Sequence, residues 1–401
     1  MPHEVSLIAT VAVGLTFAFV AGFLAVRVGL PPLVGYLLAG IAVGPFTAGF
    51  VADARLAPQL AEIGVVLLMF GVGMHFSVGD LWTVRRIAIP GAVGQIAVAT
   101  ALGAGVAHLW GWDWKDGLMF GLALSVASTV VLLRALEDRG LVSTNDGRIA
   151  IGWLIVEDLV MVLALVLLPA LVGPGHPLSK GAAPGGLWGA IGLTLGKVAA
   201  FVVLMLVVGG RIFPWLLKRV EKTGSRELFT LAVIALSLGV AFGSAELFGV
   251  SLALGAFFAG MVVHESDLSH RAANELLPLQ DSFGALFFVS VGMLFDPSVL
   301  VREPLRVLAV IGIIVVGKSL AALGIVLALR GSLRTALTVS AALAQIGEFS
   351  FILATLGVVL GLLHPESQSL IVAGALLSIT VNPLVFNLVA RRTPKAAGTR
   401  R

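Results

Sequence analysis

The chain is dominated by apolar blocks about twenty residues long. The first extends from Val5 to Val26 without a charged side chain, which gives about 33 Å of helix, enough to cross a hydrocarbon core of roughly 30 Å. Only 12% of the 401 residues are charged and 58% are hydrophobic, so the chain lacks the polar surface of a water-soluble globule. These blocks predict an all-α polytopic membrane protein and exclude an outer-membrane barrel, whose strands read as shorter, alternating segments.

Thirteen transmembrane segments are predicted from these blocks. They occupy approximately residues 5–26, 30–46, 57–76, 87–108, 116–136, 149–171, 187–210, 227–245, 249–264, 280–295, 305–329, 333–360 and 367–390. The hydrophilic stretches between them are too short to form a core of their own, so no soluble regulatory domain is expected in these 401 residues. Residues 173–186, rich in Gly and Pro, predict a loop on the outer side.

The distribution of Lys and Arg predicts the orientation, because basic residues collect on the cytoplasmic side of a membrane. With the N-terminus outside, 19 of the 26 basic residues fall on the cytoplasmic side and five fall outside, while Lys197 and Lys318 lie within segments. We therefore expect a cytoplasmic C-terminus, with a basic tail at 391–401. Orientation and attraction to anionic lipid account for the pI of 9.8, so no nucleic-acid partner is expected.

Thirteen segments in this orientation form two groups of six with opposite topology. Repeat one covers about 5–171 and repeat two about 227–390, joined by a linker helix at about 187–217. The fifth and twelfth segments correspond to one another, and polar and small residues interrupt each at mid-depth, at Ser125–Thr129 and Gln345–Glu348. Two broken helices at matching positions of inverted repeats are typical of secondary transporters and indicate a binding site near the bilayer midplane.

Two adjacent carboxylates, Glu157 and Asp158, lie near the middle of the sixth segment. Each costs at least about 2.5 kcal/mol at the bilayer centre, so the pair indicates a function. Adjacent helical residues point about 100° apart, so one carboxylate can face a water-filled cavity while the other meets a protein partner. The expected partner is Lys318, alone among the apolar residues 310–321. A buried ion pair that only fixes helix packing accounts for Lys318 and one carboxylate but not for the second.

A buried carboxylate without a partner has a specific chemical consequence. Desolvation disfavours its charged form, so a proton and a metal cation compete for a single negative charge, which is the minimal machinery of an antiporter. We predict an ion- and proton-binding site at Asp158, Glu157, Ser128 and Thr129, whose oxygens suit an alkali cation, with Lys318 compensating charge. The chain has no Cys, and we expect no catalytic residue, no cofactor and no metal besides the transported cation.

Three further polar residues within the predicted segments are candidates for supporting this site. Gln345 and Glu348 mark the second broken helix, where ligation of the cation and a role in holding the helix crossing are equal alternatives. Gln95, in the fourth segment, is explained equally well by a hydrogen bond between helices. Lys197, in the seventh segment, is interpreted as a side chain that extends toward the membrane surface.

Seven motifs spread over essentially the whole chain resemble the cation:proton antiporter-2 family, specifically its Kef-type potassium/proton antiporters and their YbaL-like branch. These motifs are Pro32–Gly40, Gly64–Gly73, Ala127–Val131, Val156–Asp158, Gly255–Gly260, Phe287–Gly292 and Gln345–Phe351. The resemblance implies a sodium/proton antiporter-like fold with two crossing broken helices, in a bacterial inner membrane. It also implies a homodimer, in which a core domain moves elevator-fashion against a dimerisation domain.

The resemblance assigns roles to particular residues. Asp158 matches the acidic residue that binds cation or proton, and Lys318 matches the intramembrane Lys that pairs with its neighbour. Ser128 and Thr129 match the crossover helix at the site. Kef-type proteins have Gln where this chain has Glu157, which leaves potassium or sodium as the cation and the charge moved per cycle open.

The resemblance also concerns regulation. Residues 269–278 resemble the cytoplasmic regulatory loop of these antiporters, with candidate residues His270, Asn274 and Glu275. Kef-type proteins usually continue into a nucleotide-binding regulatory domain after the last segment. We therefore expect either that the chain is a piece of a longer protein or that a cytoplasmic domain or subunit regulates it from elsewhere.

Several other functions are alternatives to potassium/proton antiport. A sodium/proton antiporter uses the same site, whereas a channel conducts cations without coupling and usually has a filter on a symmetry axis. An intramembrane enzyme is disfavoured because the chain has no Cys, no suitably spaced His pair and adjacent rather than facing carboxylates. Transport of an anion or organic solute requires a positive site that faces the cavity, which Lys318 provides only if its carboxylate neighbour is paired elsewhere.

Overall fold

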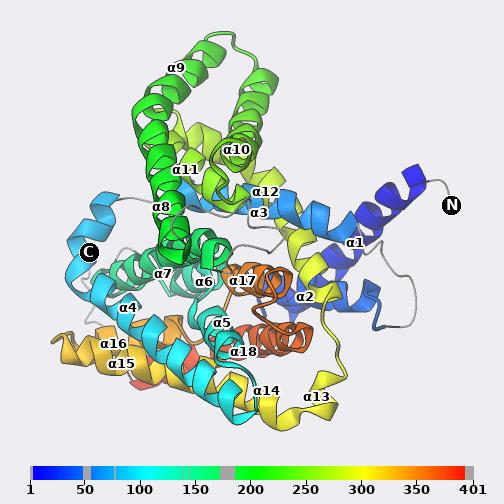
Figure 1. Ribbon diagram of the computed structural model, residues 1–401, viewed down its shortest axis with the longest axis vertical. Coiled ribbons are helices and arrows are strands. Elements are labelled where there is room, and N and C mark those ends of the chain that lie inside the picture. Colours follow the sequence, from blue (N-terminus) through cyan, green and yellow to red (C-terminus); the bar gives the residue numbers. More distant parts are fainter. Residues whose placement is uncertain are drawn as a thin grey trace. The chain divides into compact units, whose positions relative to one another are not determined.

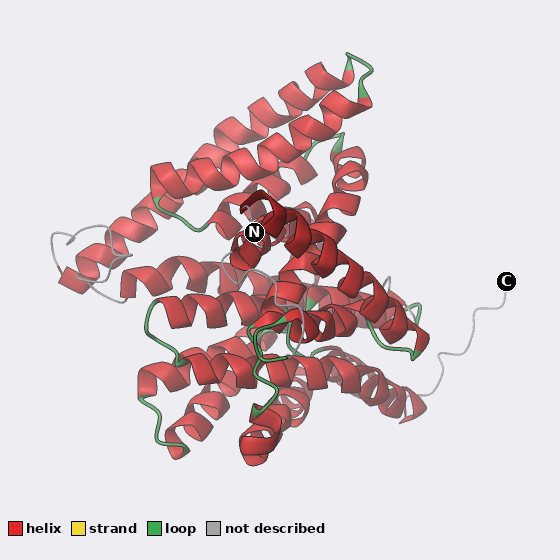
Figure 2. Cartoon of the chain, turned by 90° about the vertical axis from the view of Figure 1, so that its right-hand side faces the viewer, coloured by secondary structure: helices red, strands yellow, loops and turns green. Residues whose placement is uncertain are grey.

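A computed structural model describes residues 3–47, 56–75, 78–137, 139–142, 144–171 and 186–392. Within these residues the regular structure is entirely helical, and no strand occurs (Figure 1, Figure 2). The predicted all-α class is therefore confirmed. Most of the predicted loop at 173–186 and of the basic tail at 391–401 lies outside the described residues.

Each predicted segment has a helical counterpart. Single helices occupy nine of them: α1 (His3–Arg27), α2 (Pro32–Val43), α3 (Leu56–His75), α4 (Val78–Leu109), α7 (Asn145–Leu171), α10 (Arg226–Phe248), α11 (Leu252–His264), α12 (Ser269–Met293) and α18 (Pro365–Arg392). The others correspond to α5 (Trp114–Ser125) with α6 (Thr129–Glu137), α8 (Gly186–Leu204) with η1 (Met205–Gly209) and α9 (Gly210–Glu221), α14 (Pro304–Ile311) with η2 (Gly312–Gly317) and α15 (Lys318–Ala328), and α16 (Leu333–Ala342) with α17 (Glu348–Val359). The short helix α13 (Val299–Arg302) precedes α14.

Eight of the described helices or helix pairs are long and apolar enough to cross a membrane, and four shorter apolar helices accompany them. The protein is thus a multi-pass membrane protein. The total of thirteen crossings stays a prediction, because length and composition alone do not decide whether a short helix spans the bilayer.

Residues 269–278 were expected to form a loop, and this expectation is wrong, because α12 begins at Ser269. Ala272 and Leu276 are buried one helical turn apart, which gives this stretch an apolar face. The carboxylate of Glu275 accepts hydrogen bonds from Arg226 Nε, at 2.8 and 3.0 Å, and from Thr230 Oγ1, at 3.0 Å. The candidates His270, Asn274 and Glu275 therefore lie in the first turns of a helix, where His270 and Asn274 are exposed.

The chain divides into two compact units, and each takes segments from both predicted repeats. Unit 1 comprises Met1–Ala21, Tyr36–Ser77 and Val162–Met293, and unit 2 comprises Gly22–Gly35, Val78–Met161 and Leu294–Arg401. The repeat boundaries themselves stay a prediction. All the residues predicted to bind or support the ion belong to unit 2.

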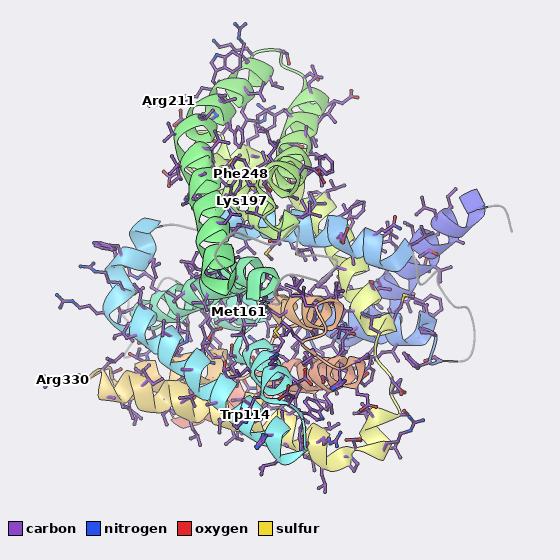
Figure 3. All side chains as sticks on the ribbon, in the orientation of Figure 1. Trp114, Met161, Lys197, Arg211, Phe248 and Arg330 are labelled. Carbon is purple, nitrogen blue, oxygen red and sulfur yellow. The ribbon has the colours of Figure 1, made fainter. Side chains whose placement is uncertain are left out.

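In unit 1, α3 packs against both α11 and α12. A Cβ at Gly73 would lie 2.1 Å from the carbonyl oxygen of Phe257, so these helix backbones are in direct contact. The continuous helix formed by α8, η1 and α9 turns back into α10, and Lys197 lies exposed on α8 (Figure 3). In the last turn of α9, Lys218 binds the exposed Asp267 at 2.7 Å, and this hydrogen bond holds the pKa of Asp267 below its usual value.

In unit 2, α4 packs along α5 and α15, and α5 packs along α17 (Figure 1). The Trp153 side chain of α7 is fully buried in a cluster with residues of α4, α6, α15 and α16, such as Ala92, Leu132, Ala322 and Val339. Asp113 caps α5 by accepting a hydrogen bond from the Trp114 amide at 2.8 Å. Between α15 and α16 the chain turns at Arg330, which has φ 61° (Figure 3). This packing holds the two broken helices in place.

Candidate functional site

The first broken helix is interrupted between Ser125, where α5 ends, and Thr129, where α6 begins. A helix end leaves backbone groups without intrahelical partners, and burial makes each unpaired group costly. Here Gln95 Nε2 donates to the Ser125 carbonyl at 2.9 Å, and the Ala127 amide donates to Glu157 Oε2 at 2.8 Å. Gln95 is itself held by Trp153 Nε1 at 3.3 Å. Gln95 therefore caps the broken helix, and its predicted support of the ion site stays a prediction.

The second broken helix is interrupted between Ala342, where α16 ends, and Glu348, where α17 begins. The Gln345 side chain binds the backbone of Ser128 at both ends: the Ser128 amide donates to Oε1 at 2.9 Å, and Nε2 donates to the Ser128 carbonyl at 3.2 Å. Lys318 Nζ donates to the Gln345 carbonyl at 2.9 Å. The two interruptions, more than two hundred residues apart in sequence, thus form one crossing.

Gly347 brings the two interruptions into van der Waals contact. A Cβ at this position would lie 2.4 Å from Ser128 Cα and 2.8 Å from the Ser128 nitrogen, distances that real Cβ atoms essentially never show. It would also lie 2.5 Å from Ser128 Cβ, which is attached directly to the backbone, so none of these three atoms can turn aside as the end of a flexible side chain can. Only Gly fits at this point of the crossing.

We expect Gly347→Ala to lower the melting temperature of the purified protein by several degrees, since forced overpacking in a tight interior costs roughly 1–3 kcal/mol. Differential scanning fluorimetry of detergent-purified protein measures the shift. The matched control is Gly239→Ala in α10, where a Cβ meets nothing within 4 Å. If both variants melt at the wild-type temperature, Gly347 is not needed for the crossing.

The charged side chains of the predicted site are buried next to this crossing. Glu157 and Lys318 are 0% exposed and Asp158 is 3% exposed. Lys318 interacts electrostatically with Glu157. Asp158 instead accepts a hydrogen bond from Thr129 Oγ1 at 3.3 Å, and its charged neighbours are the carboxylates Glu348 and Glu157. Within the described part of the chain, Asp158 forms no ion pair with a basic side chain.

The structure therefore brings together all the residues predicted to bind or support the ion in unit 2. These are Asp158, Glu157, Ser128, Thr129, Lys318, Gln345, Glu348 and Gln95. The regulatory candidates His270, Asn274 and Glu275 belong to unit 1. The roles of these residues in transport stay predictions, but their proximity is now a structural fact.

Two contributors were missed in the sequence. The buried Asn382 donates from Nδ2 to the Ala341 carbonyl at 2.9 Å, so it caps the last turn of α16. Trp153 fixes Gln95, as described above. Asn382 was detectable in principle, because an amide side chain within the apolar thirteenth segment requires a hydrogen-bond partner. The position of the Trp153 indole depends on packing, and no comparable pattern in the sequence indicates it.

Among the described residues, no group of three or more His, Cys, Asp or Glu could hold a metal ion. The buried site combines carboxylate, hydroxyl and amide oxygens with one ammonium group, at the crossing of two broken helices. Such a site in a helical membrane protein defines the class of secondary transporters.

Comparison with known proteins specifies the family. Residues 15–392 match the family model of the transmembrane region of sodium/hydrogen exchangers, and the chain belongs to this family. It is 60% identical over 395 residues to the putative cation/proton antiporter YbaL of Escherichia coli K12, which covers 98% of this chain and 70% of that protein. It is 33% identical over 388 residues to the K(+) efflux antiporter 4 of Arabidopsis thaliana, covering 96% of this chain and 64% of that protein.

A solved structure shows the same fold. The sodium proton antiporter MjNhaP1 from Methanocaldococcus jannaschii aligns with a TM-score of 0.75 over 96% of this chain and 98% of that chain, at 14% sequence identity. The predicted sodium/proton antiporter-like fold is therefore confirmed, as is the resemblance to Kef-type antiporters and their YbaL-like branch. The family is one of transporters, in agreement with the prediction that the chain is not an enzyme.

Proposed function

We propose that this protein is a secondary active potassium/proton antiporter in which a cation and a proton compete for Asp158. One observation carries the proposal: the buried Asp158 is bound by the Thr129 hydroxyl and forms no ion pair with a basic side chain among the described residues, whereas Lys318 attracts the adjacent Glu157. The two carboxylates therefore have different environments. Lys318 attracts the charge of Glu157, whereas Asp158 is the negative charge that a mobile cation can neutralise.

Exchange follows from this single charge. A bare carboxylate is unstable in a low-dielectric interior, so Asp158 binds either a proton or a cation. If only the occupied site crosses between the two sides of the membrane, release at one face requires occupation by the other species before the return. Movement of the core domain carrying the two broken helices, as an elevator, provides this alternating access.

The names of the relatives concern two parts of the proposal, the exchange of a cation for a proton and the identity of that cation. The first relative is named as a putative cation/proton antiporter, and two plant relatives, at 33% and 32% identity, are named as K(+) efflux antiporters. These names favour potassium. MjNhaP1 is named as a sodium proton antiporter, but at 14% identity it informs on the fold alone. Sodium/proton antiport at the same site is the alternative, because Glu157 stands where Kef-type proteins have Gln.

A proteoliposome assay tests this function. Vesicles containing purified protein and an imposed pH gradient receive potassium, sodium or lithium in turn, with and without a clamped membrane voltage, while a pH-sensitive dye reports the gradient. We expect potassium to dissipate the gradient at lower concentration than sodium. A preference for sodium establishes the alternative, cation flux that ignores the pH gradient establishes a channel, and the absence of any cation-dependent response overturns the proposal.

Three further features belong to the proposal. The excess of basic residues on one side supports an inner-membrane protein with its N-terminus outside and its C-terminus in the cytoplasm. A homodimer is expected from the resemblance to Kef-type antiporters. A nucleotide-binding regulatory domain or subunit on the cytoplasmic side is expected for the same reason.

A further inference from the structure

Glu348 is a buried carboxylate that the exchange mechanism above does not use. It is the first residue of α17, directly after the extended Gly347 at the crossing, and only 3% of its surface is exposed. Its carboxylate lies within hydrogen-bonding reach of the Ser128 side chain and of the Thr129 side chain and amide. These groups belong to the first broken helix, so Glu348, like Gln345, reaches across the crossing.

A purely structural role explains one of the two carboxylate oxygens. The Ser128 hydroxyl and the Thr129 amide, near the start of α6, can donate to that oxygen, as in a helix cap. The other oxygen, Oε2, is buried and has no hydrogen-bond partner among the described residues. An unpaired, buried carboxylate oxygen is costly, so a cap alone leaves this part of Glu348 unexplained.

Asp158 resembles Glu348 in having one buried carboxylate oxygen without a hydrogen-bond partner among the described residues. Its Oδ2 is bound by Thr129, but its Oδ1 is also buried and has no partner in the described structure. Glu348 is also a charged neighbour of Asp158. Glu157 Oε1 likewise has no hydrogen-bond partner among the described residues, but Lys318 attracts the charge of Glu157. Glu348 and Asp158 thus each have one unsatisfied oxygen, and neither forms an ion pair with a basic side chain in the described part of the chain.

We infer that Glu348 is a second carboxylate ligand of the transported cation, which binds between Glu348 Oε2 and Asp158 Oδ1. This inference rests on the proposed function. A cation in this position satisfies both unpaired oxygens and screens the repulsion between the two carboxylates. The hydroxyl of Thr129, which binds Asp158 and lies next to Glu348, is a third oxygen at the same place. Hard oxygen ligands of this kind suit an alkali cation.

A second charged ligand has consequences for selectivity. Coulombic attraction falls with distance, so a small cation that approaches its ligands closely gains more from an added carboxylate than a large one. Glu348 therefore strengthens binding of lithium and sodium more than binding of potassium. Replacing it with a neutral group of the same shape is expected to weaken cation binding in general and to shift the preference toward potassium.

Glu348→Gln in proteoliposomes tests the inference. The half-saturating cation concentration for dissipation of the pH gradient is measured for lithium, sodium and potassium. We expect increases of at least roughly tenfold, the usual effect of losing a charge-assisted contact, with the largest increase for lithium. The matched control is Glu303→Gln, which removes a partly exposed carboxylate bound to Arg306 at 2.7 Å and is expected to change these values less than about twofold.

The outcomes separate this inference from the proposed function. If the wild type shows no cation-dependent proton movement, the proposed function itself fails. If the wild type exchanges ions and Glu348→Gln has wild-type half-saturating concentrations, Glu348 is not a ligand. A lower maximal rate with unchanged half-saturation and ion order also overturns the inference and assigns Glu348 a structural role.

A second variant keeps the test decisive if Glu348→Gln does not fold, as judged by size-exclusion chromatography and thermal unfolding. Glu348→Asp retains the charge but withdraws the carboxylate by one methylene. Because the ligand geometry changes while the charge does not, the ratio of the sodium and potassium half-saturating concentrations is expected to change by at least about threefold. An unchanged ratio contradicts direct contact between Glu348 and the cation.

Discussion

Asp158→Asn is expected to abolish cation-dependent proton movement in proteoliposomes while the protein still folds. Asn has nearly the shape of Asp and can still accept a hydrogen bond from Thr129, which binds Asp158 at 3.3 Å in the structure. It carries no charge and does not take up a proton at working pH, so the competing species lose their common site. Exchange is expected to fall to the level of protein-free vesicles for every cation tested.

The measurement for this variant is the dye-reported pH gradient, with size-exclusion chromatography and thermal unfolding as evidence of folding. Asp267→Asn is the matched control, because Asp267 is exposed and forms a surface ion pair with Lys218 at 2.7 Å. Such pairs contribute little to stability, so exchange is expected to stay at the wild-type level. Wild-type exchange by Asp158→Asn refutes the assignment of the site to Asp158.

Lys318→Ala is expected to lower thermal stability strongly while leaving the order of cation preference unchanged. The ammonium group is fully buried, donates to the Gln345 carbonyl at 2.9 Å and balances Glu157. Its removal leaves Glu157 uncompensated, and breaking one half of a buried pair costs roughly 3–5 kcal/mol. At roughly 2–4 °C per kcal/mol for a domain of 150–250 residues, the melting temperature falls by roughly 6 °C or more.

Two comparison variants test whether the loss of stability comes from removing a buried charge next to Glu157. Lys197→Ala removes a Lys that lies exposed on α8 (Figure 3), and we expect a shift of less than about 0.5 kcal/mol, typical of surface positions. Lys318→Ala combined with Glu157→Gln removes both charges and is expected to recover part of the lost stability. If Lys318→Ala and wild type have equal melting temperatures, Lys318 does not compensate Glu157.

Asp158 has the environment that ion exchange requires. A permanent ion pair with a basic side chain would have left no charge for a mobile cation. The structure instead places the electrostatic attraction of Lys318 on Glu157, which accepts a hydrogen bond from the Ala127 amide at 2.8 Å and is thereby fixed to the first broken helix. The difference between two adjacent residues of α7 arises because they point in directions about 100° apart.

The sequence by itself determined the class of the protein and the residues that matter. Long uncharged blocks such as Val5–Val26 permit only membrane helices, because a helix satisfies its own backbone hydrogen bonds in lipid. Within such blocks the cost of a buried charge singles out Glu157, Asp158 and Lys318 without any knowledge of the fold. The polar interruptions in the fifth and twelfth segments are visible for the same reason.

Only the tertiary structure decided how these residues are paired. Helical periodicity shows that Glu157 and Asp158 face different directions, but it does not show which direction leads to Lys318. The hydrogen bonds between Gln345 and Ser128 join residues 217 positions apart. Such contacts depend on where two distant helices cross, and that position is set by packing throughout unit 2, including a Gly347 that has no room for a side chain.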